Sequence, residues 1–352
     1  MTRSPGGLTL ADIARLAGVG VGTASRALSN SPGVAATTRQ RVMAVAERHA
    51  YVVSPDASKL ARGATGRVAL VVPHLSRWFF GTMVEALESV FRDAHFDVLL
   101  YHVGDVDDRH DFFHRLPARR KVDAVVVLGF PVEEAEQNRL ELLDVRIVAA
   151  GGQDAVYPHV SIDDCEAGRQ AVDHLISLGH RAIAMVEAVD PDQPNPPSAR
   201  SDAYYQALEA AGIPVDPRLV VTTDWGGEQG AEAMGKLLSI PARPTAVYAH
   251  SDEVAFGVLR TVRRAGLRVP EDISVVGIDD HPVAALVDLT TIRQPVAEQG
   301  RLAARLVLSL LAGEPATATP TSVLLPTQLI VRGTTGPPAR GLHSEALAAP
   351  NS

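Results

Sequence analysis

The side chains best suited to catalysis or metal binding form no recognisable group in this sequence. Its twelve histidines are scattered, and His102, His110 and His114, although near one another, lack the paired spacing of zinc sites and are explained more simply as exposed residues. The first apolar run, residues 67–73, is followed by no glycine-rich phosphate loop, and neither a Walker loop nor a Gly-x-Ser-x-Gly turn occurs. We therefore expect no enzyme, no cofactor and no metal site.

Basic side chains, by contrast, are concentrated at the start of the chain. Residues 1–65 carry eight Lys or Arg against three Asp or Glu, a net charge of +5, whereas the whole chain carries −8. The remaining residues therefore carry −13. A basic segment on an acidic body is typical of a protein that places only that segment on a polyanion such as DNA, although a chance asymmetry of exposed residues gives the same pattern.

The length and composition indicate a multidomain protein. The 352 residues, 46% of them hydrophobic, suffice for two or three domains with cores of their own. The single cysteine, Cys165, excludes an intrachain disulfide, and no apolar run reaches the roughly 18 residues that span a bilayer. The chain also begins without the charged and apolar segments of a signal peptide. We expect a cytoplasmic protein with no membrane partner.

Two short helices joined by a glycine-bearing turn are predicted within the basic segment. The hydroxyl of Thr9 can cap the first helix, which places Ile13 and Leu16 inward at helical spacing. Gly18 supplies the positive φ that the turn needs, and a second helical run covers residues 21–28. This arrangement is a helix-turn-helix, although a generic helical hairpin has the same pattern.

A third helix completes the basic segment. Thr37 and Gln40 fit a capping box at its start, and Val42, Val45 and Ala46 face inward. Three helices enclose a small core, so we expect an all-α domain over residues 1–53.

The residues of this domain resemble those of a known family. TLADIARLAGVGVGTASRALSNSPGVAATTRQRVMAVAERHAY is similar to the helix-turn-helix domain of the lactose-repressor (LacI/GalR) family of bacterial transcription regulators. The resemblance implies that the helix from Val21 enters the major groove, with Val21 and Gly22 at base-reading positions and Arg26 reading a base or fixing the register. The implied DNA contacts of this domain are Thr9, Val21, Gly22, Thr23, Ser25, Arg26, Thr38 and Arg39, of which Thr23, Ser25, Thr38 and Arg39 suit phosphates.

Two departures from the family pattern affect this surface. Gly20 stands where the family usually has a helix-capping serine, and Gly22 offers no side chain to a base edge. Val21 is then limited to apolar contact, for instance with a thymine methyl group. The operator sequence is therefore not predicted.

Residues 54–66 resemble the family's hinge helix and linker. Ser54 can cap this helix, and Pro55 suits its first turn. The resemblance implies that Ser58, Leu60 and Ala61 contact DNA, with Leu60 wedged into the minor groove beside the hinge of a second subunit. A flexible linker is the alternative.

The rest of the chain alternates short apolar runs with amphipathic stretches. Runs such as 67–73, 123–128 and 246–249 are separated by helical segments such as 83–92 and 253–265. Strand and helix in alternation predict an α/β domain with parallel sheets covered on both faces. Such sheets bind ligands at the carboxyl ends of their strands.

Three phrases of this body resemble the family's regulatory domain, which shares its fold with periplasmic sugar-binding proteins. They are VSIDDCEAGRQAVDHLISLGHRAIAMV, TAVYAHSDEVAFGVLRTVRRAGLRVPEDISVVGIDD and LTTIRQP. The resemblance implies a two-lobed effector-binding and dimerisation domain over residues 67–332 with a cleft between the lobes. We expect an N-lobe of 67–162 and 293–320, a C-lobe of 163–292 and 321–332, and a disordered tail over 333–352 with no tetramerising coil.

The resemblance also places residues at the cleft, all near the ends of predicted strands. Arg200, with its fork of donors, and carboxylates such as Asp279 suit the hydroxyl groups of a ligand, while Trp225 falls where sugar-binding relatives stack a ring. The implied effector-binding residues are Phe79, Phe80, Asp163, Arg200, Trp225, Ser251 and Asp279. Core packing is the alternative for Phe79 and Phe80, and a surface or core position is the alternative for Trp225. Helix capping is the alternative for Asp252 and Asp280. Ser251 replaces the family's common asparagine, and Ala203 its usual glycine.

These observations predict a homodimeric DNA-binding regulator, usually a repressor in this family. It would bind a pseudo-palindromic double-stranded operator under the control of a small-molecule effector such as a sugar or nucleoside. The alternative is a sugar-binding or sugar-modifying protein of the same α/β fold without a regulatory role.

Overall fold

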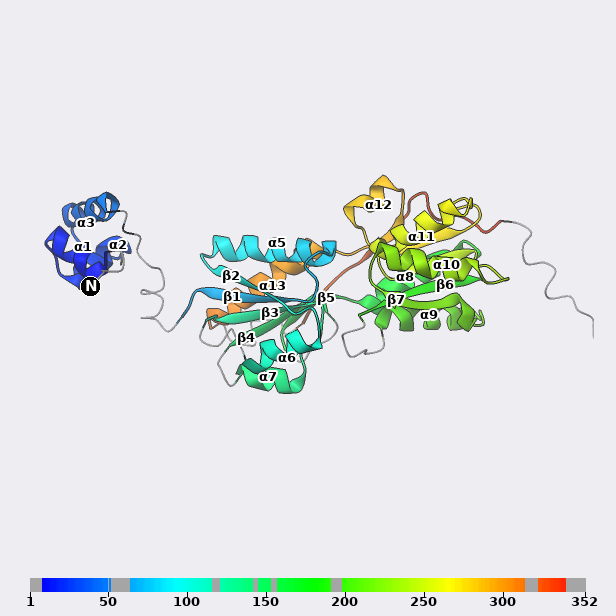
Figure 1. Cartoon of the computed structure of the whole chain (residues 1–352), viewed down its shortest axis with the longest axis horizontal. Helices are drawn as coiled ribbons and strands as arrows, with labels where there is room; N and C mark the ends of the chain where they lie inside the picture. The colour runs from blue at the N-terminus through cyan, green and yellow to red at the C-terminus, as the bar shows by residue number, and fades with distance from the viewer. Residues whose placement is uncertain are drawn as a thin grey trace, which may run out of the picture. The chain divides into compact units, whose positions relative to one another are not determined.

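A computed structural model describes residues 8–49, 51, 64–115, 121–141, 145–152, 157–190, 198–313 and 322–339 (Figure 1). The chain forms two compact units, Met1–Thr65 and Gly66–Ser352, which we call the head and the body. The hinge prediction for Ser58, Leu60 and Ala61 lies outside the described residues. No helix in the described part of the chain is long and apolar enough to cross a membrane.

The head consists of α1 (Leu10–Ala17), α2 (Val21–Leu28) and α3 (Ala36–Arg48). Thr9 and Asp12 form a capping box at the start of α1, and Gly18 ends that helix with a φ of 65°. The helices enclose a small core of Ile13, Ala14, Ala17, Ala24, Ala27 and Val42. Alanine at most of these positions lets the helices approach closely, so the predicted three-helix unit with its glycine turn is confirmed.

Two local predictions for the head were wrong. Leu16 is 44% exposed, because Ile13, Ala14 and Ala17 form the buried face of α1 and Leu16 lies to one side of it. Thr37 and Gln40 form no capping box, because α3 begins earlier, after Ala35, which provides no side-chain hydrogen bond.

The first sheet of the body defines the N-lobe. Its described strands lie in the order β11-β5-β4-β3-β1-β2, and all neighbours are parallel. Helices α5 (Trp78–Asp93) and α13 (Val296–Leu311) cover one face, and α6 (Val106–Arg115) and α7 (Glu134–Glu141) cover the other (Figure 1). The strands are β1 (Arg67–Val72), β2 (Asp97–His102), β3 (Ala124–Leu128), β4 (Arg146–Ala150), β5 (His159–Ile162) and β11 (Ser322–Leu325).

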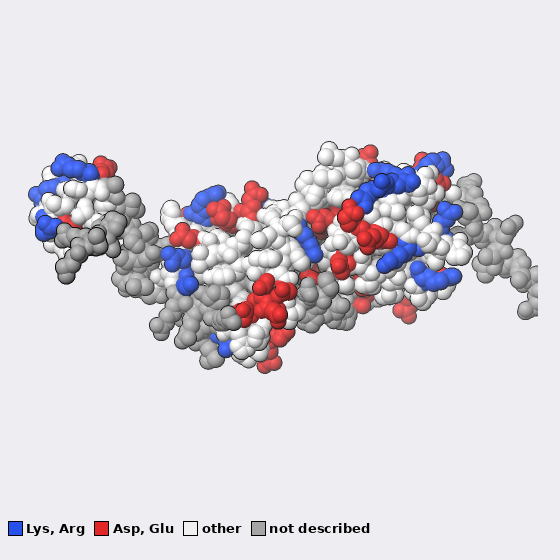
Figure 2. All heavy atoms as spheres, viewed as in Figure 1, with Lys and Arg blue, Asp and Glu red and all other residues white. Residues whose placement is uncertain are grey.

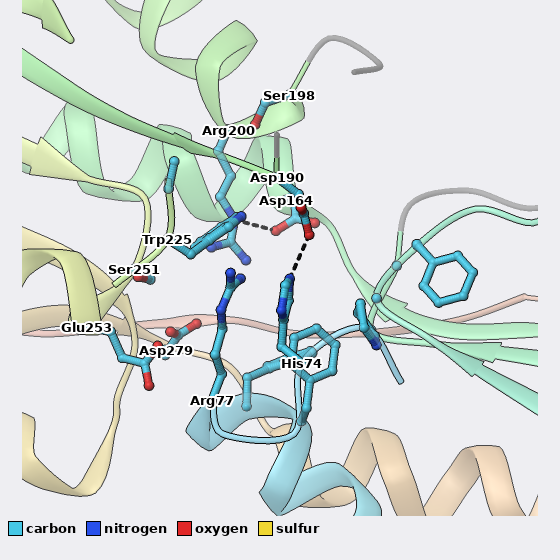
Figure 3. Close-up of a pocket in the computed structure, with 18 of the residues that line it drawn as sticks. His74, Arg77, Asp164, Asp190, Ser198, Arg200, Trp225, Ser251, Glu253 and Asp279 are labelled. Carbon is cyan, nitrogen blue, oxygen red and sulfur yellow. Dashed lines mark hydrogen bonds and ion pairs between the residues drawn. The ribbon is translucent and has the colours of Figure 1, made fainter. Parts of the chain in front are cut away.

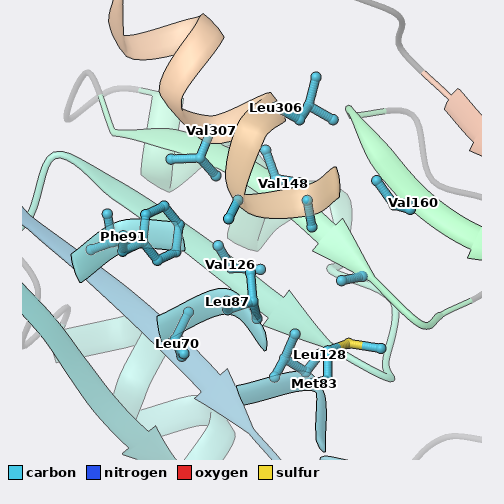
Figure 4. Packing of buried hydrophobic residues seen from close by; sticks show 14 of the residues in the cluster. Leu70, Met83, Leu87, Phe91, Val126, Leu128, Val148, Val160, Leu306 and Val307 are labelled. Atoms are coloured by element: carbon cyan, nitrogen blue, oxygen red, sulfur yellow. The ribbon is translucent and has the colours of Figure 1, made fainter. Parts of the chain in front are cut away.

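The core of the N-lobe lies between this sheet and the helix pair α5 and α13. Figure 4 shows Met83, Leu87 and Phe91 of α5 packed with Leu306 and Val307 of α13 over the strands. The central strands are fully buried, which explains why β3 has the continuous apolar sequence AVVVL rather than an alternating one.

The second sheet defines the C-lobe. Its described order is β12-β10-β9-β8-β6-β7, parallel except for β12, which pairs antiparallel with β10. Cores on both faces involve α8 and α9 on one side and α10 and α11 on the other. The elements are β6 (Ile183–Val189), β7 (Val220–Asp224), β8 (Ala246–Ala249), β9 (Ser274–Asp279), β10 (Thr290–Arg293), β12 (Gln328–Ile330), α8 (Asp164–Ser177), α9 (Ala199–Ala210), η1 (Pro217–Leu219), α10 (Gly227–Leu238), α11 (Asp252–Arg264) and α12 (Pro282–Leu286).

The C-terminal segments differ from the prediction. Residues 322–325, expected in the C-lobe, form β11 and pair with β5 of the N-lobe, so the chain crosses to the C-lobe only before β12. Residues 333–339, expected to be disordered, pack on the C-lobe instead. The amide of Val275 donates to the carbonyl of Thr334 at 2.8 Å, and Ser274 Oγ donates to the Gly336 carbonyl at 3.0 Å. This segment therefore satisfies backbone groups at the start of β9 that β10 does not reach.

Candidate functional site

The first turn of α2 forms an open surface on the head. Val21 is 49% exposed although it is apolar. Gly20 is the N-cap and provides no side-chain cap, and a Cβ atom added to Gly22 would meet nothing within 4 Å. The amides of Thr23 and Ala24 donate to the Gly20 carbonyl, whereas those of Val21 and Gly22 are open to an external acceptor such as a phosphate.

Some polar side chains of the head are exposed, and others form hydrogen bonds within the head. Among the described residues, the side chain of Arg26 donates to the Gly22 carbonyl of its own helix alone, at 3.2 Å, and it remains exposed. Arg39 instead donates to the carbonyl oxygens of Ala27, at 3.1 Å, and Ser31, at 2.6 Å, so it ties α3 to the end of α2. Thr23, Ser25 and Thr38 have hydroxyl groups without a hydrogen-bond partner among the described residues.

Thr9 belongs to the capping box of α1. Its hydroxyl donates to Asp12 Oδ2 at 2.7 Å, and the hydrogen bonds from Thr9 lower the pKa of Asp12 to about 2. Figure 2 shows several basic side chains on the visible face of the head and mixed signs on the body. The head thus has the charge and the exposed helix that a DNA-binding domain needs.

A cavity of about 230 Å³ lies between the lobes of the body, at the carboxyl ends of strands from both sheets. Figure 3 shows the polar side chains that converge on it from loops and helix starts. The structure brings together six of the seven predicted effector-binding residues at this cavity: Phe79, Phe80, Arg200, Trp225, Ser251 and Asp279.

The seventh, Asp163, is not part of the cavity lining. It is the N-cap of α8, where its Oδ1 accepts from the amide of Glu166 at 2.9 Å. The next residue, Asp164, lines the cavity instead. Two consecutive aspartates at the start of a helix could have indicated this difference. The first, which caps the helix, is held by a backbone amide, and the second is left to face the ligand site.

Arg200 is held in place by the C-lobe. Its Nε donates to Asp164 Oδ1 at 2.7 Å, and its Nη1 donates to the carbonyl of His250. Burial disfavours the charge, but the carboxylates of Asp164 and Asp279 raise the pKa of Arg200 above its ordinary value. Arg200 is therefore a cation that the C-lobe holds in place through its Nε and Nη1.

Asp279 is a buried carboxyl at the end of β9. It accepts from Gln294 Nε2 at 2.6 Å, and Gln294 in turn accepts from Gln299 Nε2 of α13 at 3.0 Å. Burial raises the pKa of Asp279 to about 7, although Arg200 opposes the shift. Its φ of 132° is unusual for a residue with a side chain. Asp279 can thus exchange a proton near neutral pH while it faces the cavity.

The neighbouring Asp252 and Asp280 have structural partners, but neither is a helix cap, because Ser251 caps α11 and His281 caps α12. Asp252 is buried and accepts from Thr291 Oγ1 at 2.6 Å and from the amide of His281 at 2.8 Å. Asp280 pairs with Arg293 and Arg332. Ser251 caps α11 by accepting from the amide of Val254, at 3.3 Å, and still reaches the cavity wall.

The aromatic residues have two roles. Phe79 and Phe80 pack edge to face, 5.1 Å apart, and both also contribute to the N-lobe core. Glycines 129 and 151 make room for their rings, because a Cβ atom there would lie 2.6 Å or less from a ring carbon. Trp225 packs partly on the C-lobe core and also lines the cavity. Core packing and cavity lining therefore do not exclude one another here.

The sequence prediction missed the loop after β1. His74, Arg77 and Trp78 line the cavity, and His74 Nε2 lies 2.6 Å from Asp190 Oδ2 of the C-lobe. The amide of Trp78 donates to Glu253 at 3.3 Å. The signal was the position of these residues directly after a buried strand. In the described residues no group of three or more potential ligands could hold a metal ion.

Two protein families match parts of the chain. Residues 9–54 match the family described as "Bacterial regulatory proteins, lacI family", and residues 172–335 match "Periplasmic binding protein-like domain". The two matches fall on the head and on the body, in the order of the two sequence resemblances.

Similar proteins cover nearly the whole chain. The HTH-type transcriptional repressor CytR of Escherichia coli K12 is 32% identical over 331 residues, which are 93% of this chain and 96% of that protein. The crystal structure of the lac repressor dimer bound to operator and the anti-inducer ONPF has a TM-score of 0.82 at 25% identity, covering 94% of this chain and 100% of that chain. A complex of the transcriptional regulator CelR with cellobiose has a TM-score of 0.68 at 32% identity, covering 93% and 99%.

Proposed function

Since this chain belongs to the lacI family of bacterial regulatory proteins, we propose that it represses transcription as a homodimer bound to a pseudo-palindromic operator. It is a helix-turn-helix transcription regulator with a two-lobed α/β body. A sugar or nucleoside in the cleft controls operator binding, and the protein acts in the cytoplasm, on the nucleoid when bound to DNA, without an enzymatic activity of its own.

One observation carries the proposal. The same chain combines an exposed recognition helix on a basic head with a cavity lined by an indole ring and fixed hydrogen-bonding groups. A sugar-binding protein without a regulatory role does not need a DNA-binding head. An enzyme needs a nucleophile and a base, which the described cavity lining does not bring together.

On the DNA side, Val21 offers apolar contact to a thymine methyl, and Arg26 is free to reach a base or phosphate. Thr23, Ser25 and Thr38 supply hydroxyls to phosphates. Arg39 contributes through its charge and through the bracing of α2, because its guanidinium is already engaged. The amides of the first turn of α2 add a phosphate site next to Gly22.

On the effector side, the cleft suits a polyhydroxylated ring. Trp225 provides a flat face for the C–H side of a sugar, and Asp164 and Asp279 provide acceptors for hydroxyl groups. The similar regulator CelR was solved in complex with cellobiose, which favours a sugar over a nucleoside as the effector. Arg200 fixes Asp164 and so orients one of these acceptors.

Effector binding in the cleft and operator binding by the head are coupled through the N-lobe. Closure of the lobes on an effector shifts the N-lobe, and a dimer then holds its two heads at a different spacing. The hydrogen-bonded series Asp279, Gln294, Gln299 is one physical connection from the cavity to α13 of the N-lobe. Ser58, Leu60 and Ala61 complete the proposal as minor-groove contacts between the paired hinges.

Selection of DNA from a random library with the purified full-length protein tests the proposal. We expect an inverted-repeat site, and a shift assay on that site should respond to one compound in a panel of sugars and nucleosides. A library without enrichment above background would refute the regulator function. Turnover of a sugar by the same preparation would favour the sugar-modifying alternative.

A further inference from the structure

The stacking face of Trp225 is covered by the protein itself. Arg77, on the loop after β1 of the N-lobe, lies with its guanidinium carbon 5.6 Å from the centre of the Trp225 ring of the C-lobe. Figure 3 shows both side chains directed into the same cavity. A cation over an indole ring is an attractive contact, stronger where water is excluded.

The same loop carries the other contacts between the lobes in this part of the cleft. His74 pairs with Asp190 at 2.6 Å, and the amide of Trp78 donates to Glu253 at 3.3 Å. The ring of Trp78 also lies 5.0 Å from that of His281. Arg77 is therefore part of a set of contacts that join the two lobes across this part of the cleft.

Arg77 is held by charge rather than by a direct ion pair. Its guanidinium makes no hydrogen bond or salt bridge to another residue within the described ranges, although the carboxylates of Asp190, Glu253 and Asp224 lie close enough to act on it. Burial lowers the pKa of Arg77, and these three carboxylates oppose that shift. An arginine keeps its proton in proteins, so the group over the ring is a cation at every working pH.

A ligand ring and Arg77 cannot share this face. Two flat groups with a ring between them need about 7 to 8 Å of separation, since each contact takes about 3.5 to 4 Å. The observed 5.6 Å leaves no room for a third layer. A ring that stacks on Trp225 has to displace the guanidinium.

We propose that Arg77 is an internal occupant of the ligand site, and that a ring ligand enters by replacing it on Trp225. This rests on the proposed effector-binding role of the cleft. Once Arg77 leaves, the carboxylates that now act on it, those of Asp190, Glu253 and Asp224, leave this side of the subsite acidic. Arg200 lines the same cavity but is held through its Nε and Nη1 by Asp164 and His250. The subsite therefore favours a neutral or basic ring with hydroxyl or nitrogen donors over an anionic ring.

Tryptophan fluorescence tests the proposal without DNA or effector. The chain has two tryptophans, Trp78 and Trp225, so W78F leaves Trp225 as the single reporter. In this background R77M removes the charge and keeps most of the chain length, while R77K keeps a charge. R92M is the matched control, because Arg92 is an exposed arginine of the same lobe that pairs with Glu88. Circular dichroism confirms that each variant is folded.

Quenching by acrylamide, caesium and iodide at equal ionic strength is compared with quenching of free N-acetyltryptophanamide. We expect R77M to raise acrylamide quenching of Trp225 about twofold or more, whereas R77K and R92M change it little. In R77M, caesium should quench relatively better than iodide, because the exposed subsite is acidic.

Two outcomes overturn the proposal. Equal acrylamide quenching with and without Arg77 would show that it does not cover the ring, and better quenching by iodide than by caesium would contradict an acidic subsite. The same series with W225F in place of W78F shows whether any change belongs to Trp78. Because no operator is involved, failure of the DNA selection leaves this result valid, and failure here leaves the regulator function standing.

Discussion

The carboxyl group of Asp279 should make the stability of the body depend on pH. Burial raises its pKa from the ordinary 3.8 to about 7. The folded protein therefore binds this proton more tightly than the unfolded chain between these two values, so stability falls as pH rises from about 4 to about 7. At 1.36 kcal/mol per pKa unit, the loss contributed by Asp279 is about 4 kcal/mol.

The variant D279N removes this titration and keeps an oxygen that can accept from Gln294, as Asp279 does now. We expect the free energy of unfolding of the parent to fall between about pH 5 and about pH 8, and that of D279N to fall by about 2 to 3 kcal/mol less over the same interval, because part of the change lies below pH 5. Urea unfolding followed by tryptophan fluorescence measures both, because Trp78 and Trp225 line the same cavity.

The neighbouring Asp280 provides the control. Burial opposes its charge, but hydrogen bonds from Arg332 and Arg293 lower its pKa, so its contribution is complete above about pH 4 and is lost only in more acidic solution. D280N should lower stability by the same amount at about pH 5 and about pH 8. Parallel pH profiles for D279N and the parent would refute the assignment of a buried, proton-exchanging carboxyl to Asp279.

Three further outcomes are expected. L60A should weaken operator binding on the order of tenfold in a shift assay and leave sugar affinity unchanged; equal operator affinity would contradict the hinge role. G257A should destabilise the body by about 3 kcal/mol in urea, because its Cβ would lie 1.8 Å from the Gly227 carbonyl oxygen, whereas G235A, with nothing within 4 Å, should be neutral or stabilising. W225A should weaken binding of the effector about tenfold by calorimetry while W225F retains most of it; an unchanged affinity for W225A would exclude stacking.

The fold was accessible from the sequence because its signals are local and repeated. Short apolar runs between amphipathic stretches specify parallel strands, and the capping residue Thr9 and the turn residue Gly18 specify the first helix of the head. The end of the chain lacked such a signal. Residues 333–339 are held by the backbone bond from Val275 to Thr334 and by the Thr334 hydroxyl, which accepts from the amide of Thr290 and donates to the carbonyl of Val275. Such partners lie far away in the sequence, so the order of this segment does not show in its composition.

The site was predictable to the level of strand ends but not of side-chain direction. The carboxyl end of a parallel strand places a residue near the cleft, and one position along decides between a cap and a lining group, as for Asp163 and Asp164. Arg39 shows the same limit on the head, where its spacing suits a phosphate but carbonyl groups of α2 and the following turn engage it. The position of Arg77 after a buried strand indicated the cleft, but nothing indicated its contact with Trp225, because the two residues are distant in the sequence.

A cleft occupied by its own arginine changes how effector affinity should be interpreted. A contact of about 1 to 2 kcal/mol keeps the ring covered most of the time, and it weakens the apparent affinity of a stacking ligand by roughly 6- to 30-fold relative to its affinity for the uncovered ring. The factor is the same for every neutral ligand that needs the ring and is absent for a ligand that does not. Arg77 therefore sets the concentration at which the regulator responds, and the gain in affinity on R77M distinguishes the compounds that stack on Trp225 from those that bind elsewhere in the cavity.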